Sequence, residues 1–192
     1  MGGFTLIQVA APTRTRIADY QAYEARVRAM ADRINARFPD AAHPPIVLHV
    51  AHHDASDVYE YYRAADVCVV TSLHDGMNLV AKEFVSARDD ERGVLVLSQF
   101  AGASRELPEA IIVNPYDVEQ CAAALQLALA MPMAEQRARM RLMRALVRDF
   151  NVYRWAGRML IDAGGLRRRD RLVDWSVEPD WRVRDAEGER VR

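Results

Sequence analysis

Short apolar runs alternate with longer stretches of helical character, and this alternation limits the possible folds more than any other feature of the chain. The apolar runs have the length of strands and lie at 4–10, 46–51, 67–72, 94–99 and 111–115. Each is followed by a segment with helical spacing or a helix-opening residue, at 18–38, 54–65, 78–90, 103–107 and 118–131. Parallel strands need helical crossovers, and strands buried on both faces read as continuous apolar runs. The order predicts an α/β fold with a doubly wound parallel sheet in a single Rossmann-like domain.

Two further helices are predicted near the C-terminus, at about 134–150 and 152–163. Beyond Gly164 the chain is rich in arginine and has no sustained period. We therefore assign residues 1–164 to one domain, which includes these crossover helices. We expect residues 165–192 to form a basic helix end followed by a largely disordered tail.

The size and charge of the chain exclude several classes of protein. Its 192 residues are 51% hydrophobic, enough for one good core. A net charge of -1 gives no global electrostatic reason to expect nucleic acid or an anionic membrane as partner. No apolar run approaches the roughly 20 residues that span a bilayer, and the N-terminus lacks the layout of a signal peptide. We expect a cytoplasmic protein in which Cys68 and Cys121 are buried free thiols.

The segment TSLHDGMNLVAKEFV, residues 71–85, combines polar residues with the start of a helix. It follows the third strand, and open α/β sheets bind ligands outside the carboxyl ends of their strands. Asn78 is a candidate N-cap, which would leave the N–H groups of Met77 to Val80 for an anion such as a diphosphate. Gly76 permits a tight turn. The Asp75 carboxylate suits a ligand with many hydroxyl groups, because it accepts charge-assisted hydrogen bonds.

Glu83 lies one turn after Leu79 and is expected to point back toward the same turn. It would suit the two hydroxyl groups of a ribose, as acidic residues do in dinucleotide folds. The alternative from the residues alone is an ordinary turn, an ordinary cap at Asn78 and a surface carboxylate at Glu83. Lys82 favours a site slightly, because it is the only lysine among 26 basic residues.

Other candidate sites are weaker. Residues 99–107 follow the fourth strand, and Gly102 with the next N–H groups would form a second anion cradle. A metal site near His49, His52 and His53 is disfavoured, because two adjacent histidines in an extended segment point to opposite sides. The chain has no glycine-rich dinucleotide fingerprint, no phosphate-binding loop and no nucleophile elbow.

Four segments together resemble a known family. They are IQVAAPTR (7–14), DVCVVTSLHDGMNLVAKEFVSAR (66–88), GVLVLSQFAGASREL (93–107) and IIVNPYD (111–117). They are similar to the C-terminal half of trehalose-6-phosphate synthases, which are retaining glycosyltransferases of the GT-B architecture in glycosyltransferase family 20. The likeness runs over about residues 4–163, and DGMNLVAKE with VLSQFAGA is its most specific part.

The resemblance implies a donor site for UDP-glucose, which is a substrate and not a cofactor. It assigns Asp75, Gly76, Met77 and Asn78 to the glucose, Leu79 and Val80 to the diphosphate, Glu83 to the ribose, and the loop at His52 and His53 to the uracil. Asp75 is the residue that we name as catalytic. The family transfers glucose to glucose-6-phosphate with retention and needs no metal. Hydrogen-bond donors in fixed positions and helix ends would stabilise the departing diphosphate.

The chain departs from the family pattern in three ways. His74 stands where the family motif usually has arginine. The upstream R-x-D-x-x-K-G segment and the N-terminal domain that binds glucose-6-phosphate are absent from the sequence. Without the arginine and lysine of that segment, which neutralise the phosphates of the donor in the family, we expect weak donor binding and little or no transferase activity from this chain alone. We also expect an exposed apolar patch near Trp155, Met159 and Leu160, which is covered by a separate N-terminal polypeptide, by self-association or by nothing.

Alternatives therefore stay open. The chain would also suit a non-catalytic nucleotide-sugar-binding or regulatory module that has lost the transferase reaction. A glucosylglycerol-phosphate synthase-like transferase would differ only in its acceptor. The carrier is open between UDP, GDP and ADP, since the family's nucleobase contacts are mostly to the backbone.

Overall fold

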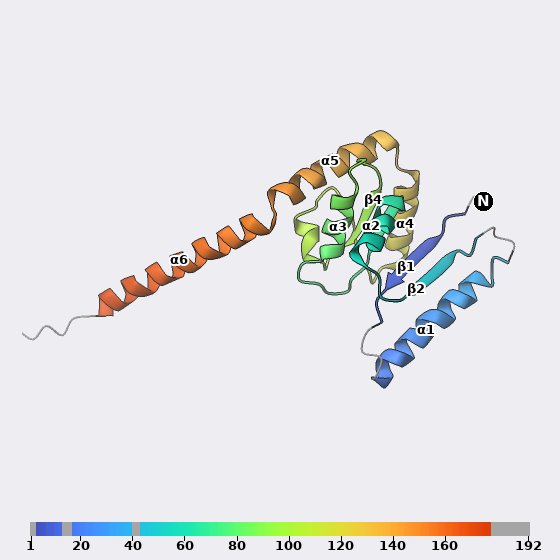
Figure 1. Ribbon diagram of the computed structural model, residues 1–192, viewed down its shortest axis with the longest axis horizontal. Coiled ribbons are helices and arrows are strands. Elements are labelled where there is room, and N and C mark those ends of the chain that lie inside the picture. The colour runs from blue at the N-terminus through green and yellow to red at the C-terminus, as the bar shows by residue number, and fades with distance from the viewer. Residues whose placement is uncertain (1–2, 13–16, 40–42, 178–192) are drawn as a thin grey trace, which may run out of the picture. The chain divides into compact units, whose positions relative to one another are not determined.

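The computed structural model describes residues 3–12, 17–39 and 43–177, and side chains as far as residue 169. The chain divides into two compact units, residues 1–65 and 66–192. Figure 1 labels most of the helices and strands of both. Each unit is described by itself.

The first unit is a strand–helix–strand–helix segment. Its elements are β1 (Leu6–Ala10), α1 (Ala18–Asn35), β2 (Ile46–Val50) and α2 (Ala55–Ala64). β1 and β2 are parallel, with Leu6 opposite Ile46. The Asn35 side chain fixes the start of β2, because its amide donates to the Ile46 carbonyl over 2.8 Å and accepts from the Ile46 N–H over 2.9 Å. One side chain thus satisfies both backbone groups of a strand end.

The second unit contains a three-stranded parallel sheet in the order β3-β4-β5. Its elements are β3 (Val67–Val70), α3 (Leu79–Ala87), β4 (Val94–Ser98), the 3₁₀ helix η1 (Gly102–Arg105), β5 (Ile111–Val113), α4 (Val118–Ala130), α5 (Met133–Asp149) and α6 (Val152–Val177). The helices between the strands are the crossovers that parallel pairing requires.

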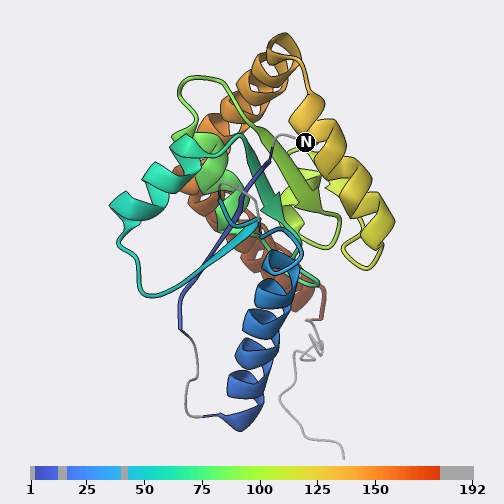
Figure 2. The ribbon, with the colours of Figure 1, turned by 90° about the vertical axis from the view of Figure 1, so that its right-hand side faces the viewer.

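The central strand β4 is buried on both faces along its whole length. Val94 and Val96 pack in one apolar cluster with Ala124 and Ala128 of α4. Because side chains alternate along a strand, the buried residues between them face the other side, which α3 covers. Figure 2 shows α4 (gold) to the right of this sheet and α3 (green) to its left. This sheet therefore has helices on both faces, as a doubly wound fold does.

The predicted strands and helices are all present, with ends that differ by a few residues. The five strands form two parallel sheets, one in each unit. The helix predicted to end at Ala163 instead continues to Val177. Leucine and arginine after Gly164 and Gly165 are good helix formers, and a glycine costs only about 1 kcal/mol in a helix. The predicted tail thus begins as helix over 165–177, and its remainder, 178–192, lies outside the described residues.

Within the described ranges, no helix is long and apolar enough to cross a membrane. Trp155, Met159 and Leu160 of α6 were predicted to be exposed, and all three are exposed. The exposed fraction of Trp155 is 56%.

Candidate functional site

The loops that follow β3 and β4 are joined by backbone hydrogen bonds. The Asp75 N–H donates to the Phe100 carbonyl over 3.2 Å, and the Gly102 N–H donates to the Asp75 carbonyl over 2.9 Å. The Ala103 N–H donates to the Met77 carbonyl over 2.7 Å. Asp75 and Ala101 form an isolated parallel bridge. The two candidate anion cradles are therefore one structure, which we call the paired loops, residues 74–78 and 99–103.

Gly102 is required where the two loops approach each other. A Cβ atom at this position would overlap the Gly76 carbonyl oxygen, and it would lie 2.9 Å from the Gly76 carbonyl carbon and 3.3 Å from Met77 Cα. All three are backbone atoms, so no flexible side chain can move aside. The absence of a side chain at Gly102 is what permits the pairing.

The Asp75 carboxylate is mostly engaged inside its own turn. Its Oδ1 atom accepts from the N–H groups of Met77 and Asn78, each over 3.1 Å, and its Oδ2 atom accepts from Asn78 Nδ2 over 3.0 Å. These bonds, first among them the one from the Met77 N–H, hold the pKa of Asp75 below its ordinary value. A carboxylate has about four acceptor positions, so one on Oδ2 remains for a ligand.

Two of the N–H groups that we expected to be open to an anion are therefore used by Asp75. Met77 and Asn78 donate to its carboxylate, and the Ala81 N–H donates to Asn78 Oδ1 over 2.9 Å. The helix α3 begins at Leu79, so its own hydrogen bonds do not use the N–H groups of Leu79 and Val80. Both residues are exposed, and the exposed fraction of Leu79 is 59%. These two N–H groups, at the positive end of the helix dipole, are the better anion donors.

The predicted N-cap at Asn78 is confirmed, and the same side chain also bonds to Asp75. It is buried, and its φ of 72° lies in the left-handed region that asparagine tolerates better than most residues. Its side chain accepts from Ala81 and donates to Asp75, so one residue ties the turn to the helix. Asp54, at the corresponding position of α2, makes no side-chain cap bond.

Glu83 and Lys82 lie on the first turns of α3, where both are half-buried. Lys82 Nζ is 2.6 Å from Glu106 Oε2, just beyond η1. The single lysine of the chain thus pairs α3 with the segment after β4. This partner could not be predicted from a local pattern, because the two residues are 24 positions apart.

The histidines named from the sequence lie in different units. His74 is exposed in the paired loops. His53 belongs to the first unit, where its ring packs edge-on against His49 and Tyr61 at centroid distances of 6.3 Å and 5.8 Å. Among the described residues, His53 Nε2 is buried without a hydrogen-bond partner. In that part of the chain no group of three or more His, Cys, Asp or Glu side chains is placed to hold a metal ion.

Asp75→Asn is expected to destabilise the protein by roughly 1–2 kcal/mol near neutral pH, since the amide brings a donor toward Asn78 Nδ2. The folded-state pKa of Asp75 is depressed, so its carboxylate stabilises the fold above the ordinary carboxyl pKa. That contribution is lost as pH falls through the depressed value. Urea denaturation from pH 7 to pH 3 should therefore show the difference between wild type and variant shrinking with acid. A difference that stays constant with pH would contradict this role.

The comparisons with known proteins bear on what this site is. A family model for glycosyltransferase family 20 matches residues 1–163. The chain belongs to this family. The resemblance found in the motifs at 66–88 and 93–107 is thereby confirmed.

The similar proteins are trehalose-6-phosphate synthases. That of Klebsiella pneumoniae is 43% identical over 162 residues, which are 84% of this chain and 34% of the relative. The crystal structure of an alpha,alpha-trehalose-phosphate synthase (UDP-forming) from Burkholderia xenovorans, in complex with glucose-6-phosphate, matches with a TM-score of 0.79 and 45% identity, covering 82% of this chain and 35% of that one. An Escherichia coli structure bound with UDP-2-fluoro glucose has a TM-score of 0.79 at 40% identity, with the same coverage. The chain thus spans about a third of the length of these relatives, and GT-B transferases are its structural neighbours.

Proposed function

We propose that this chain supplies the donor-binding part of a retaining glucosyltransferase that makes trehalose-6-phosphate from UDP-glucose and glucose-6-phosphate. The observation that carries the proposal is the exposed N-terminus of α3, held in place by Asp75 and Asn78. Membership of glycosyltransferase family 20 and the relative that is bound with UDP-2-fluoro glucose support the choice of ligand.

In this proposal each part of the paired loops has a role toward the donor. The N–H groups of Leu79 and Val80 bind the diphosphate, and they stabilise the charge that develops on it as the glycosidic bond breaks. The remaining acceptor position of Asp75 binds a glucose hydroxyl, with the backbone of Gly76–Asn78 beside the sugar. Glu83 accepts from the ribose hydroxyls. His74 contributes at the rim.

The donor site is tested by calorimetric titration of the purified chain with UDP-glucose and with UDP. We expect saturable binding that weakens by at least about tenfold in the Asp75→Ala/Glu83→Ala variant, because each lost charge-assisted bond is worth roughly 1.5–3 kcal/mol. The matched control is Glu119→Ala/Asp162→Ala, which removes two exposed carboxylates on α4 and α6 and should bind as wild type does. Equal loss in both variants, or no binding by a folded wild-type chain, would refute the donor site.

Transfer itself is a separate proposal, since the chain spans about a third of its relatives' length. We propose that transfer requires the remaining part of the architecture. The competing proposal is a nucleotide-sugar-binding module without transferase activity. Assays for trehalose-6-phosphate should give product only when the chain is combined with a glucose-6-phosphate-binding half. Donor binding without product in that mixture would favour the non-catalytic module.

A further inference from the structure

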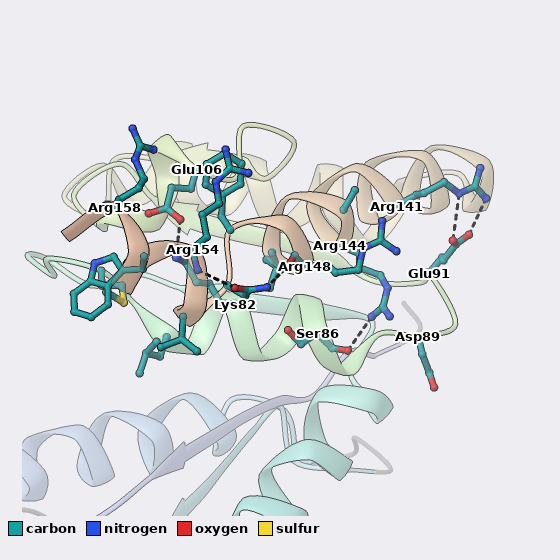
Figure 3. Close-up of a pocket in the computed structure, with 18 of the residues that line it drawn as sticks. Lys82, Ser86, Asp89, Glu91, Glu106, Arg141, Arg144, Arg148, Arg154 and Arg158 are labelled. Carbon is teal, nitrogen blue, oxygen red and sulfur yellow. Dashed lines mark hydrogen bonds and ion pairs between the residues drawn. The ribbon is translucent and has the colours of Figure 1, made fainter. Parts of the chain in front are cut away.

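A groove of about 1110 Å³ lies between α3, α5 and the first turns of α6. Figure 3 shows five arginines on the α5 and α6 side of this groove. They are Arg141, Arg144, Arg148, Arg154 and Arg158. We call this the arginine groove. Its volume exceeds the roughly 300–1,000 Å³ of ordinary small-ligand pockets.

Two of the five arginines build the wall of the groove. Arg141 forms a two-point ion pair with Glu91, over 3.2 Å and 2.8 Å. Arg144 Nη1 donates to the carbonyl oxygens of Val85 and Ser86, over 3.0 Å and 2.8 Å, at the C-terminal end of α3. The Arg144 bonds hold α5 against α3 and satisfy helix carbonyls that lack intrahelical partners, whereas Arg141 joins α5 to the segment after α3.

The other three arginines are available to a partner. Among the described residues, the one ion pair of Arg148 is with its neighbour Asp149, at 3.7 Å, and the Arg148 side chain is 81% exposed. Arg154 lies 4.1 Å from the centroid of the Phe150 ring. Among the described residues, no carboxylate forms an ion pair with Arg154 or Arg158. In the described part of the chain, these three cations therefore form no ion pair with a carboxylate from another element.

Apolar surface lies beside these cations. Phe150, Val152 and Trp155 line the groove and are all exposed. A smaller pocket of about 280 Å³ adjoins it and is lined in part by Leu107, Leu146 and Phe150. Exposed aromatic and arginine side chains beside an apolar pocket are the usual composition of an interface hot spot.

We propose that the arginine groove docks a polypeptide segment that carries acidic side chains beside apolar anchors. The acidic side chains would pair with Arg148, Arg154 and Arg158, and an apolar anchor would enter the smaller pocket. A second copy packed through α6 is disfavoured, because it would bring arginines together. Single-stranded nucleic acid is the competing occupant, and the adjoining apolar pocket, which an apolar side chain would fill, favours the polypeptide. The groove also reaches Gly76, Met77 and Leu79 of the proposed donor site, and docking of the polypeptide does not require a bound donor.

The test uses a fluorescein-labelled helical peptide with glutamates on one face and leucine and phenylalanine on the other. Fluorescence anisotropy with the full chain should show saturable binding that weakens as salt is raised from about 0.05 M to 0.5 M. Arg148→Glu/Arg154→Glu/Arg158→Glu should weaken it by at least about tenfold, and Trp155→Ala should also weaken it. Arg167→Glu/Arg168→Glu/Arg169→Glu makes the same charge change on α6 outside the groove and should bind as wild type does.

Several results would overturn the proposal. They are no saturable binding by wild type, equal loss in both triple variants, equal binding of a scrambled peptide, or tighter binding of a single-stranded oligonucleotide. Sedimentation of the chain alone gives a further contradicting result. A dimer that the Arg148→Glu/Arg154→Glu/Arg158→Glu variant abolishes would show that a second copy covers the groove. Circular dichroism is used to confirm that each variant is folded. If the triple variant unfolds, the single variants Trp155→Ala and Arg158→Glu replace it in the binding test.

Discussion

Gly102→Ala should lower the free energy of unfolding by about 2 kcal/mol and weaken UDP-glucose binding by at least about tenfold. The new Cβ would overlap the Gly76 carbonyl, so the loops must separate or distort. Separation breaks the hydrogen bonds that join Asp75 to Phe100 and Gly102, and it shifts the turn that positions the α3 N-terminus. Urea denaturation and a calorimetric titration measure the two effects.

Gly157→Ala is the matched control for this change. Gly157 lies inside α6, and a Cβ there meets nothing within 4 Å. The substitution should raise stability by about 0.5–1 kcal/mol, because glycine is a poor helix former. Wild-type stability and wild-type donor affinity in Gly102→Ala would mean that the paired loops are not a tight unit.

Asn78→Ala should be the most damaging substitution at the start of α3, with a loss of about 2–3 kcal/mol. It removes the cap on the Ala81 N–H, worth about 1 kcal/mol, and the bond to Asp75. It also places alanine at a φ of 72°, a conformation that costs a side chain of this kind roughly 1 kcal/mol or more. Thermal and urea denaturation measure the loss.

Asn78→Gly separates these contributions. Glycine adopts positive φ without strain and costs a helix cap only a few tenths of a kcal/mol, so we expect a loss of about 1 kcal/mol. The free energy of unfolding should be highest for wild type, lower for Asn78→Gly and lowest for Asn78→Ala. If alanine is as stable as glycine, the left-handed conformation of Asn78 is not maintained in solution.

The periodic segments were predictable because each carries its own signal. Apolar runs gave the strands, and the cap at Asn78 could be named because an asparagine stands just before a helical pattern. Asp54 stands at the same position before α2, but its side chain makes no such bond, so the residue type alone does not decide whether a cap forms. The end of α6 was missed because two adjacent glycines suggest a break, whereas the residues after them favour helix.

The tertiary details of the site were not predictable from local pattern. Residues 74–78 and 99–103 were each recognised as ends of parallel strands, but their direct pairing depends on the close approach at Gly102. The engagement of the Asp75 carboxylate with Met77 and Asn78 is a property of the folded turn. The Lys82–Glu106 pair joins residues far apart in sequence. Such contacts are fixed by packing, which no single segment specifies.

The central claim is that the N-terminus of α3 holds the diphosphate of a nucleotide sugar. The most direct test is titration of the ¹⁵N-labelled chain with UDP-glucose, followed by amide NMR shifts. The account predicts saturating shifts centred on the amides of Leu79 and Val80, with smaller ones through the paired loops. Shifts confined to other surfaces, or none in a folded chain at millimolar UDP-glucose, would contradict it.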